Sequence, residues 1–497
     1  MRRSYFVVAA LALFAAQSLR AEVTMGSIWG DGMVLQRNAE LLVGGKSDGE
    51  SVTVTTSWSG KSKYRAAVVE GQWSVEIPTP ESDGTPHTMT FDDGDRLTLS
   101  NILLGDVWLL MGQSNMQMPM SGFGSGDLRI ACNYLKHQHV EGAAAVISRA
   151  NPSQSIRLFT AEFNPQRRPQ ERAEGAWQLN TPEAVRDFSA TGYFFGKVLQ
   201  ESLDIPIGLV SVNRGASTIE TWMSREVLES VGITDLSVLD REKLPNAAYQ
   251  KPCYLYNGMV APLKGVSVAG AIWYQGESNM ARREEYLSLF PAFVAGLRSH
   301  FRGGEFPLYY AQIAPFCGDG LDKFDVVLMR ETMVKLMDIT PRTGMVALTD
   351  IGESEVHHPR FKREVGERLA MWALADKYAP GCVDCRAPEY RSMSVTYDAA
   401  QRQKGVALSF DYATTGFHFA ERNSTSTQFE IAGEDRVFYP AQVKLINNKG
   451  AMIWVWCKEV AEPVAARYAF HNYADGDLFN AAGMAVSSFR TDDWECE

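Results

Sequence analysis

The chain has 497 residues, which is long for one domain and predicts two or three folded units. Hydrophobic residues make up 45% and charged residues 22%, a globular composition that excludes a largely disordered chain, a collagen-like chain and a multi-span membrane protein. Lys and Arg number 48 against 59 Asp and Glu, giving a net charge of −11, and no basic stripe lies beyond the extreme N-terminus. Nucleic acid is therefore not an expected partner.

The first 21 residues have the order of a signal peptide. Two arginines precede an apolar run from Tyr5 to Ala16, and a polar stretch then ends at Ala21. The run is too short to anchor the chain in a bilayer, so we expect cleavage after Ala21 and no membrane span in the mature protein. A buried N-terminal helix is the alternative. The charged-then-apolar order favours export to the periplasm or the extracellular space.

Residues 22–100 have the texture of a small β domain. Short alternating pieces, such as SVTVTTSW at 51–58 and YRAAVV at 64–69, are separated by turns rich in Gly, Ser and Asp. Such strands favour an antiparallel sandwich. Strand pieces without helical periodicity return at 382–497. We therefore predict β-sandwich-like domains at both ends of the chain.

Residues 101–381 alternate apolar strands with helices. Continuous apolar runs stand at 103–111, 205–213, 267–275, 307–314 and 344–350. Helix-like stretches lie between them, at 188–203 and 286–301. Strand and helix in alternation predict a parallel sheet flanked by helices, so the fold class is α/β.

A serine stands directly after the first of these buried strands, in GQSNM at 112–116. Ligands of α/β sheets bind at the carboxyl ends of the strands, so the hydroxyl of Ser114 is a candidate nucleophile. The segment lacks the second glycine of the GxSxG elbow found in α/β-hydrolases. Taken alone, a serine at such a place is more often a helix cap.

Two further loops supply candidate donors for an oxyanion hole. NRGAS at 213–217 and YQGES at 274–278 each follow a predicted strand. An oxyanion hole needs N–H groups aimed at the charge that develops on a carbonyl oxygen. The candidates are the backbone N–H groups of Ser114 and Gly215 and the side chain of Gln275. Ordinary strand-to-loop turns are the alternative.

The segment TDIGESEVHHP at 349–359 holds the candidate base. A serine hydroxyl needs an imidazole to take its proton, and an acid or carbonyl must orient that imidazole. The residues available are Asp350, Glu355, His357 and His358, just before an amphipathic helix that we expect from 360 to 378 with Pro359 at its entrance. A metal site is disfavoured because adjacent histidines rarely ligate one ion. A helix-capping histidine is the other alternative.

These segments together resemble the sialate O-acetylesterase family, a branch of the SGNH hydrolases, over residues 28–494. The resemblance is carried by GDVWLLMGQSNMQMPM (105–120), IRLFT (156–160), GYFFGKVL (192–199), PIGLV and ETWMS (within 206–224), LYNGMVAPL (255–263), WYQGESN (273–279), HHPRFKREVGERLA (357–370) and FRTDDW (489–494). It implies a two-step esterase without metal or organic cofactor. Ser114 is then the nucleophile, His358 the base, and Gly215 and Gln275 oxyanion donors.

The matching motifs also contain Gln113, Asn257 and Glu277, which we predict to bind substrate. Aromatic residues near these motifs, among them Trp222, Trp273 and Tyr274, are candidates for stacking on a sugar, although such residues more often belong to the core.

The chain departs from the family pattern at two places. Relatives often have an aromatic residue and two glycines where this chain has Arg214, Gly215 and Ala216. The SGNH pattern also has an aspartate three residues before the base, where this chain has Glu355. We rank Glu355 first as the third member of the triad, with Asp350 or a backbone carbonyl as alternatives.

The sequence thus predicts an exported serine esterase that removes O-acetyl groups from sugars, foremost from O-acetylated sialic acids. Acetylated plant polysaccharide such as acetylxylan is the alternative substrate. A non-catalytic glycan-binding protein is a hypothesis of a different class, and the intact Ser114, Gln275 and His358 argue against it. A lipase is disfavoured because no long apolar segment suggests a lid.

Overall fold

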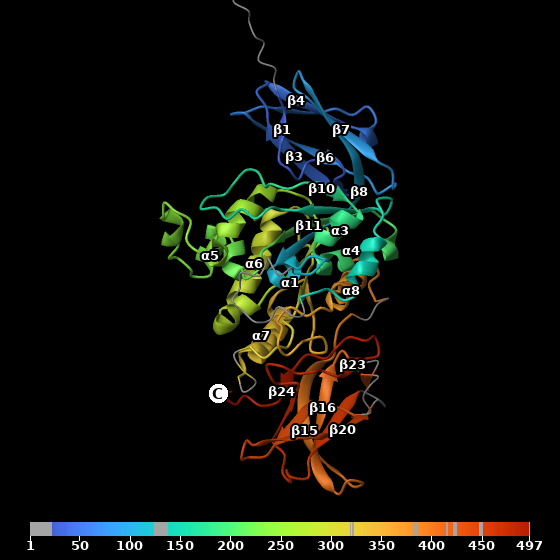
Figure 1. Ribbon diagram of the computed structural model, residues 1–497, viewed down its shortest axis with the longest axis vertical. Helices are drawn as coiled ribbons and strands as arrows, with labels where there is room; N and C mark the ends of the chain where they lie inside the picture. Colours follow the sequence, from blue (N-terminus) through green and yellow to red (C-terminus); the bar gives the residue numbers. More distant parts are fainter. Residues whose placement is uncertain are drawn as a thin grey trace, which may run out of the picture.

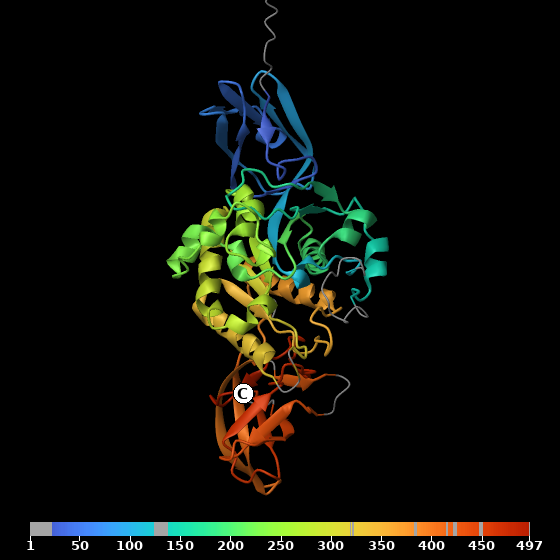
Figure 2. The ribbon, with the colours of Figure 1, turned by 60° about the vertical axis from the view of Figure 1, so that its left-hand side comes forward.

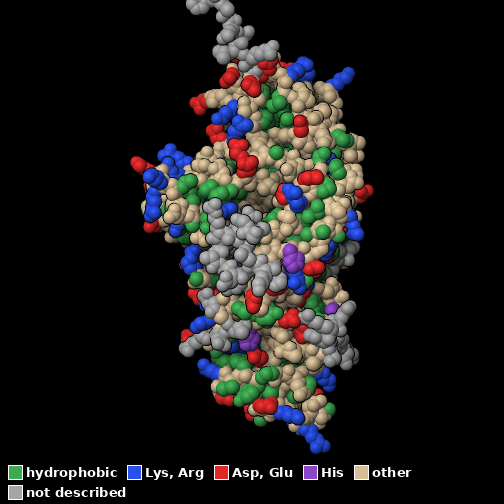
Figure 3. All heavy atoms as spheres, viewed as in Figure 1, with side chains coloured by type: hydrophobic (Ala, Val, Ile, Leu, Met, Phe, Trp, Pro, Cys, Tyr) green, Lys and Arg blue, Asp and Glu red, His purple; other side chains and the backbone are tan. Residues whose placement is uncertain are grey.

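The computed structural model describes residues 22–123, 138–318, 320, 323–381, 385–413, 416–420, 425–446 and 451–496. Three layers follow one another along the long axis: a β layer from the N-terminal part, a central α/β layer and a C-terminal β layer (Figures 1 and 2). Acidic and basic side chains are scattered over all three layers on the face shown in Figure 3. The predicted signal peptide lies outside the described residues. Within the described ranges, no helix is both long and apolar enough to cross a membrane.

The N-terminal layer is antiparallel apart from one short parallel pair, and its core is the cluster around Val43, Val54 and Phe91. Its strands are β1 (Thr24–Met25), β2 (Val34–Gln36), β3 (Glu40–Lys46), β4 (Ser51–Thr56), β5 (Tyr64–Ala67), β6 (Gln72–Pro78) and β7 (His87–Asp92). Buried and exposed residues alternate along β4, as expected for a strand with one face in a core.

One long strand, β8 (Arg96–Gly112), belongs to both the first and the second layer. Its first half pairs antiparallel with β7, and its second half becomes the centre of the parallel sheet. The backbone ladder therefore runs across residues 100 and 101, where we placed a domain limit. The four predicted segments (1–21, 22–100, 101–381 and 382–497) stay predictions.

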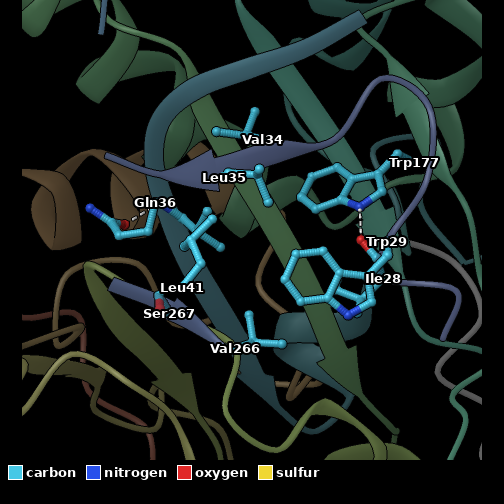
Figure 4. A pocket seen from close by; sticks show the side chains of 10 residues that line it. Ile28, Trp29, Val34, Leu35, Gln36, Leu41, Trp177, Val266 and Ser267 are labelled. Atoms are coloured by element: carbon cyan, nitrogen blue, oxygen red, sulfur yellow. Dashed lines mark hydrogen bonds between the residues drawn. The ribbon is translucent and has the colours of Figure 1, made fainter. Parts of the chain in front are cut away.

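An apolar seam also joins these two layers. Trp29 and Trp177 lie side by side in Figure 4, beside Val34 and Leu35 of β2. The indole N–H of Trp177 donates to the carbonyl of Ile28 at 2.7 Å. Contacts of this kind fix the first layer against the sheet that carries the site.

The central sheet has the strand order β10-β9-β11-β8-β12-β13-β14. All neighbours in this order are parallel except β10 and β9. The new strands are β9 (Ile156–Thr160), β10 (Trp177–Leu179), β11 (Ile207–Asn213), β12 (Gly270–Tyr274), β13 (Leu308–Ala311) and β14 (Thr343–Val346). The carboxyl ends of β8, β11 and β12 are adjacent, which places the loops after Gly112, Asn213 and Tyr274 at one edge of the sheet.

Helices cover both faces of this sheet. Those described are α1 (Ser114–Gln117), α2 (Ala143–Ser148), α3 (Pro182–Asp187), α4 (Ala190–Leu203), α5 (Arg225–Ser230), α6 (Tyr286–His300), α7 (Asp325–Ile339) and α8 (Lys362–Ala373). One core cluster lies between the sheet and α5 to α7, and the other between the sheet and α4 and α8. Gly366 lets α8 approach α4 closely, because a Cβ there would meet the carbonyl of Thr191 at 2.6 Å. The helix predicted after Pro359 begins at Lys362, two residues later than expected.

The C-terminal layer consists of antiparallel sheets around one core. Two four-stranded sheets, β15-β16-β21-β20 and β19-β18-β22-β24, share a buried cluster with the two-stranded sheet β17-β23. The strands are β15 (Glu389–Asp398), β16 (Gln403–Asp411), β17 (Phe417–Phe419), β18 (Phe429–Ala432), β19 (Phe438–Pro440), β20 (Gln442–Ile446), β21 (Met452–Trp456), β22 (Ala465–Tyr468), β23 (Leu478–Asn480) and β24 (Phe489–Arg490). The predicted α/β class, with β sheets at both ends, is confirmed at this level.

This layer is tied to the loop that carries the candidate base. The hydroxyl of Thr349 donates to the carbonyl of Val486 at 2.7 Å, and the N–H of Gly476 donates to the carbonyl of Thr349 at 2.9 Å. The buried guanidinium of Arg330 on α7 donates to the carbonyls of His471 and Asn472. The C-terminal layer therefore holds this loop at its first residue, Thr349, and is also bonded to α7.

Candidate active site

Ser114 is presented by a sharp turn between β8 and α1. Gly112, the last residue of β8, has a φ of 143°, and a Cβ there would lie 2.2 Å from the carbonyl oxygen of Tyr274. Only glycine fits so close to the neighbouring strand. Ser114 is the first residue of α1, so its N–H has no acceptor within that helix.

The hydroxyl of Ser114 is hydrogen-bonded to the ring of His358. Ser114 Oγ and His358 Nε2 are 2.8 Å apart, although the two residues are 244 positions apart in the chain. The ring of Phe123 lies against that of His358, with 5.2 Å between centroids. This is the geometry that a serine nucleophile and its general base require.

The second ring nitrogen of His358 meets an amide. His358 Nδ1 lies 2.9 Å from Oε1 of Gln138. Because a side-chain carbonyl oxygen only accepts hydrogen bonds, Nδ1 carries the proton, and Nε2 is then free to accept the proton of Ser114. Gln138 thus orients the ring as the third member of a triad would, but without a negative charge.

The carboxylates that we predicted for this role lie elsewhere. Glu355 is exposed. Asp350 accepts two hydrogen bonds from Arg368, at 2.8 and 2.6 Å. The turn closed by the N–H of Val356 donating to Glu353 carries the Glu355 side chain outward. The structure therefore brings neither predicted acid to the His358 ring. Nothing in the sequence around Gln138 marked it as a partner.

Both histidines are held neutral. Burial lowers the pKa of His358 well below 6.5, and the nearby His357 and Lys362 lower it further. Burial and Lys362 lower the pKa of His357 to about 4. A neutral His358 is the form that can act as a base.

Replacing Gln138 with glutamate is expected to raise the pKa of His358, because a carboxylate beside the ring stabilises the imidazolium ion. The acid limb of the kcat/KM profile should then move up by about 1 to 2 pH units. Gln138→Leu should instead leave Nδ1 without an acceptor and lower kcat by about 10²-fold or more. A pH profile on an aryl acetate measures both. An unchanged profile in Gln138→Glu would show that this contact does not orient the base.

The N–H of Gly215 lies beside the serine, but it already donates a hydrogen bond to a side chain. A Cβ on Gly215 would lie 3.4 Å from Cβ of Ser114, so this loop touches the nucleophile. The N–H donates to Oε1 of Gln117 at 2.6 Å. Gly215 can therefore serve an oxyanion only if Gln117 turns aside. The next residue, Ala216, has a φ of 56°, a left-handed conformation that glycine adopts more readily than alanine.

Gln275 does not reach the site. Its side-chain amide nitrogen donates to the carbonyl of Ser217 at 3.1 Å and to Oδ1 of Asn279 at 2.8 Å. Its oxygen accepts from the hydroxyl of Tyr286 at 2.7 Å. The residue is fully buried, and all of its hydrogen-bonding groups are used within the fold. The structure thus makes Gln275 a brace for the loop rather than a placed oxyanion donor.

A buried polar chain lies beneath the serine. Asn115 donates from Nδ2 to Oε1 of Glu277 at 2.6 Å and to the carbonyl of His357 at 2.9 Å. Its Oδ1 accepts from the ammonium group of Lys362 at 2.5 Å. Lys362 is fully buried, which lowers its pKa to about 7. Burial raises the pKa of Glu277. Asn115 and Lys362 lie in the motifs quoted above, but no role had been predicted for them.

The other predicted binding residues separate into two groups. Gln113 lines the cleft, and its side-chain oxygen accepts from the N–H of Ser278 at 3.3 Å. Asn257 donates to the carbonyl of Gln166 at 3.1 Å and does not line the cleft. The three aromatic candidates are fully or almost fully buried and belong to the core: Trp222, Trp273 and Tyr274.

The serine and histidine open into a cleft of about 1030 Å³. Its described lining is Gln113, Ser114, Gln117, Pro119, Phe123, Thr160, Ala161, Glu162, Phe163, Asp187, Ser189, Ser211, Asn213, Arg214, Gly215, Ala216, Tyr249, Glu277, Ser278, Met280, Phe316, His357 and His358. This volume is ample for a sugar.

Comparison with known proteins agrees with this geometry. The family model described as carbohydrate esterase, sialic acid-specific acetylesterase matches residues 104–375. Sialate O-acetylesterase of Rattus norvegicus is 27% identical over 406 residues, covering 70% of this chain and 72% of that protein. The enzyme of Homo sapiens is 25% identical over 410 residues, covering 75% and 74%. A carbohydrate acetylesterase from Xanthomonas citri superposes with a TM-score of 0.81 at 30% identity, over 95% of this chain and 100% of that one.

The fold, the serine–histidine pair and these matches define a carboxylic ester hydrolase that acts on carbohydrate acetyl esters. The chain belongs to the sialic acid-specific acetylesterase family of carbohydrate esterases. The resemblance found in its sequence motifs is thereby confirmed.

Proposed function

We propose that this chain is an exported serine esterase that removes O-acetyl groups from sugars, foremost from O-acetylated sialic acids. The observation that carries the proposal is the 2.8 Å contact between Ser114 Oγ and His358 Nε2 in the wall of a sugar-sized cleft. The sialate O-acetylesterases among its relatives support the choice of substrate. The order of residues 1–21 supports export, and the parallel sheet with its strand-end serine supports an SGNH-type fold.

The reaction follows from the contacts. Ser114 Oγ attacks the acetyl carbonyl carbon while its proton passes to His358 Nε2, and the imidazolium ion is oriented through Nδ1 by Gln138. The tetrahedral oxyanion lies beside the N–H groups of Ser114 and, once Gln117 turns aside, Gly215. Collapse expels the sugar oxygen, which takes the proton from His358. Water then attacks the acetyl-serine with His358 again as base; the bond from Ser114 Oγ to the acyl carbon breaks, Oγ takes the proton back from His358, and acetate leaves.

Acetate release by the purified mature chain tests the function. O-acetylated sialic acid, acetylated xylan and a small aryl acetate are compared in parallel, with Ser114→Ala as control. We expect release from sialic acid at the highest kcat/KM and none above background in the variant. Release from xylan alone would move the assignment to plant polysaccharide. Turnover of none of the three would refute the esterase and favour glycan binding without catalysis.

A further inference from the structure

Arg214 occupies an unusual place in the cleft. It immediately precedes Gly215, the residue that touches the serine, and it lines the cleft. Its guanidinium carbon lies 4.2 Å from the ring centroid of Phe163 and 5.3 Å from that of Tyr249. Two aromatic faces therefore hold the planar cation in position at the cleft wall.

The guanidinium has no anionic partner in the described structure. Its Nε is buried without an acceptor, and no described residue accepts a hydrogen bond from its terminal nitrogens. A permanently charged group in a partly buried place is costly to leave unpaired. An anion delivered by the substrate would remove that cost.

The other charged and titratable residues that line the cleft do not provide a second cation. Arg214 is the sole lysine or arginine among the described lining residues. Of the acids in the lining, Asp187 is paired with Arg186 at 2.8 Å, Glu277 is bound by Asn115, and Glu162 is exposed. The two lining histidines are neutral because their pKa values are lowered. Among the described lining residues, Arg214 is therefore the cation that can bind an anionic group of a ligand.

We propose that Arg214 binds a carboxylate of the substrate, so that O-acetylated acidic sugars are preferred over neutral ones. The guanidinium fork matches a carboxylate in shape and charge. The inference rests on the proposed function for the acetyl transfer, and it deepens that function by naming the substrate class. Sialic acids and uronic acids share this chemistry.

Matched pairs of ligands test the proposal. O-acetylated sialic acid and O-acetylated oligogalacturonate are each compared with their carboxyl methyl esters for acetate release. The deacetylated acids and esters are compared as competitive inhibitors of aryl acetate hydrolysis. We expect the wild type to prefer each recognised acid over its ester by about tenfold or more, as for a hydrogen bond to a charged group. In Arg214→Met this ratio should fall to about one, and Arg214→Lys should restore part of it.

Arg225→Met is the matched control, because it removes the same charge from α5, where Arg225 contacts Glu229 outside the cleft. It should keep the wild-type ratio. Equal handling of acid and ester by the wild type, in both release and inhibition, would overturn the proposal. So would a preference that survives in Arg214→Met. Competitive inhibition by the deacetylated ligands measures carboxylate binding without acetyl transfer. A failure of the proposed function would be seen separately, as the absence of acetate release from every sugar.

Discussion

Replacing His358 with alanine should lower kcat/KM for an aryl acetate by about 10³-fold, since a positioned general base contributes about 10²- to 10⁴-fold. The reason is the 2.8 Å contact through which the ring takes the proton of Ser114. His471→Ala is the matched control, because that histidine pairs with Glu430 in the C-terminal layer. The control should keep wild-type activity. Retention of more than a tenth of the activity in His358→Ala would contradict the assignment.

The same histidine sets the expected pH dependence. The base is active when neutral, and burial lowers its pKa well below 6.5. The kcat/KM profile reports the free enzyme, so its acid limb should lie well below pH 6.5, and activity should persist at pH values where an ordinary histidine is protonated. An acid limb centred at or above 6.5 would show that the ring is more solvated than the structure indicates.

The second large effect is expected from the buried chain of Lys362, Asn115 and Glu277. Burial penalises each charge and the other charge offsets part of that penalty, so the effects of Lys362→Met and Glu277→Gln on the free energy of unfolding should not add. The double variant should lose about 1 to 3 kcal/mol less than the sum of the singles, because the two charges interact through Asn115. Urea denaturation of the four proteins measures this coupling.

An exposed lysine provides the comparison. Lys335 on α7 lies 3.6 Å from Glu331 at the surface, and Lys335→Met should change the free energy of unfolding by less than about 0.5 kcal/mol. If the changes in the free energy of unfolding caused by Lys362→Met and Glu277→Gln simply add, the two charges do not interact.

The burial of Lys362 also predicts how the stability of the folded chain changes with pH. Lys362 has a pKa of about 7 in the folded chain, against 10.5 for an ordinary lysine. Between these values the unfolded chain binds more protons than the folded chain at this position. Below pH 7 the cost of burying the charged Lys362 is fully present. The contribution of Lys362 to stability should therefore rise as the pH increases from about 7 to 10.5. Lys362→Met should lose this rise.

The strands, helices and reactive pair could be predicted because their signals are local. Ser114 follows a continuous apolar run, and His358 precedes an amphipathic helix, so each pattern places one residue at a strand or helix end. Parallel pairing then brings the loops together. The sequence does not show that β8 continues through residues 100 and 101, because the composition changes there while the strand does not end.

Side-chain direction and distant partners had no such signal. Gln138 is 220 positions from His358 and lies in no motif, so nothing in the sequence links them. Gln275 stands at a strand end, where spacing does not say whether the side chain faces the cleft or the core. Here Tyr286 of α6 and Asn279 hold it inward. Glu355 has the right position in the chain, but the local turn directs it outward.

The central claim is that Ser114 carries the acetyl group during turnover. Acid quenching during steady-state hydrolysis of an aryl acetate, followed by peptide mass analysis, tests it most directly. We expect an acetyl group on the peptide that contains Ser114, localised to that serine and absent from Ser114→Ala. Hydrolysis by Ser114→Ala at the wild-type rate, or an acetyl group trapped on another residue, would contradict the account.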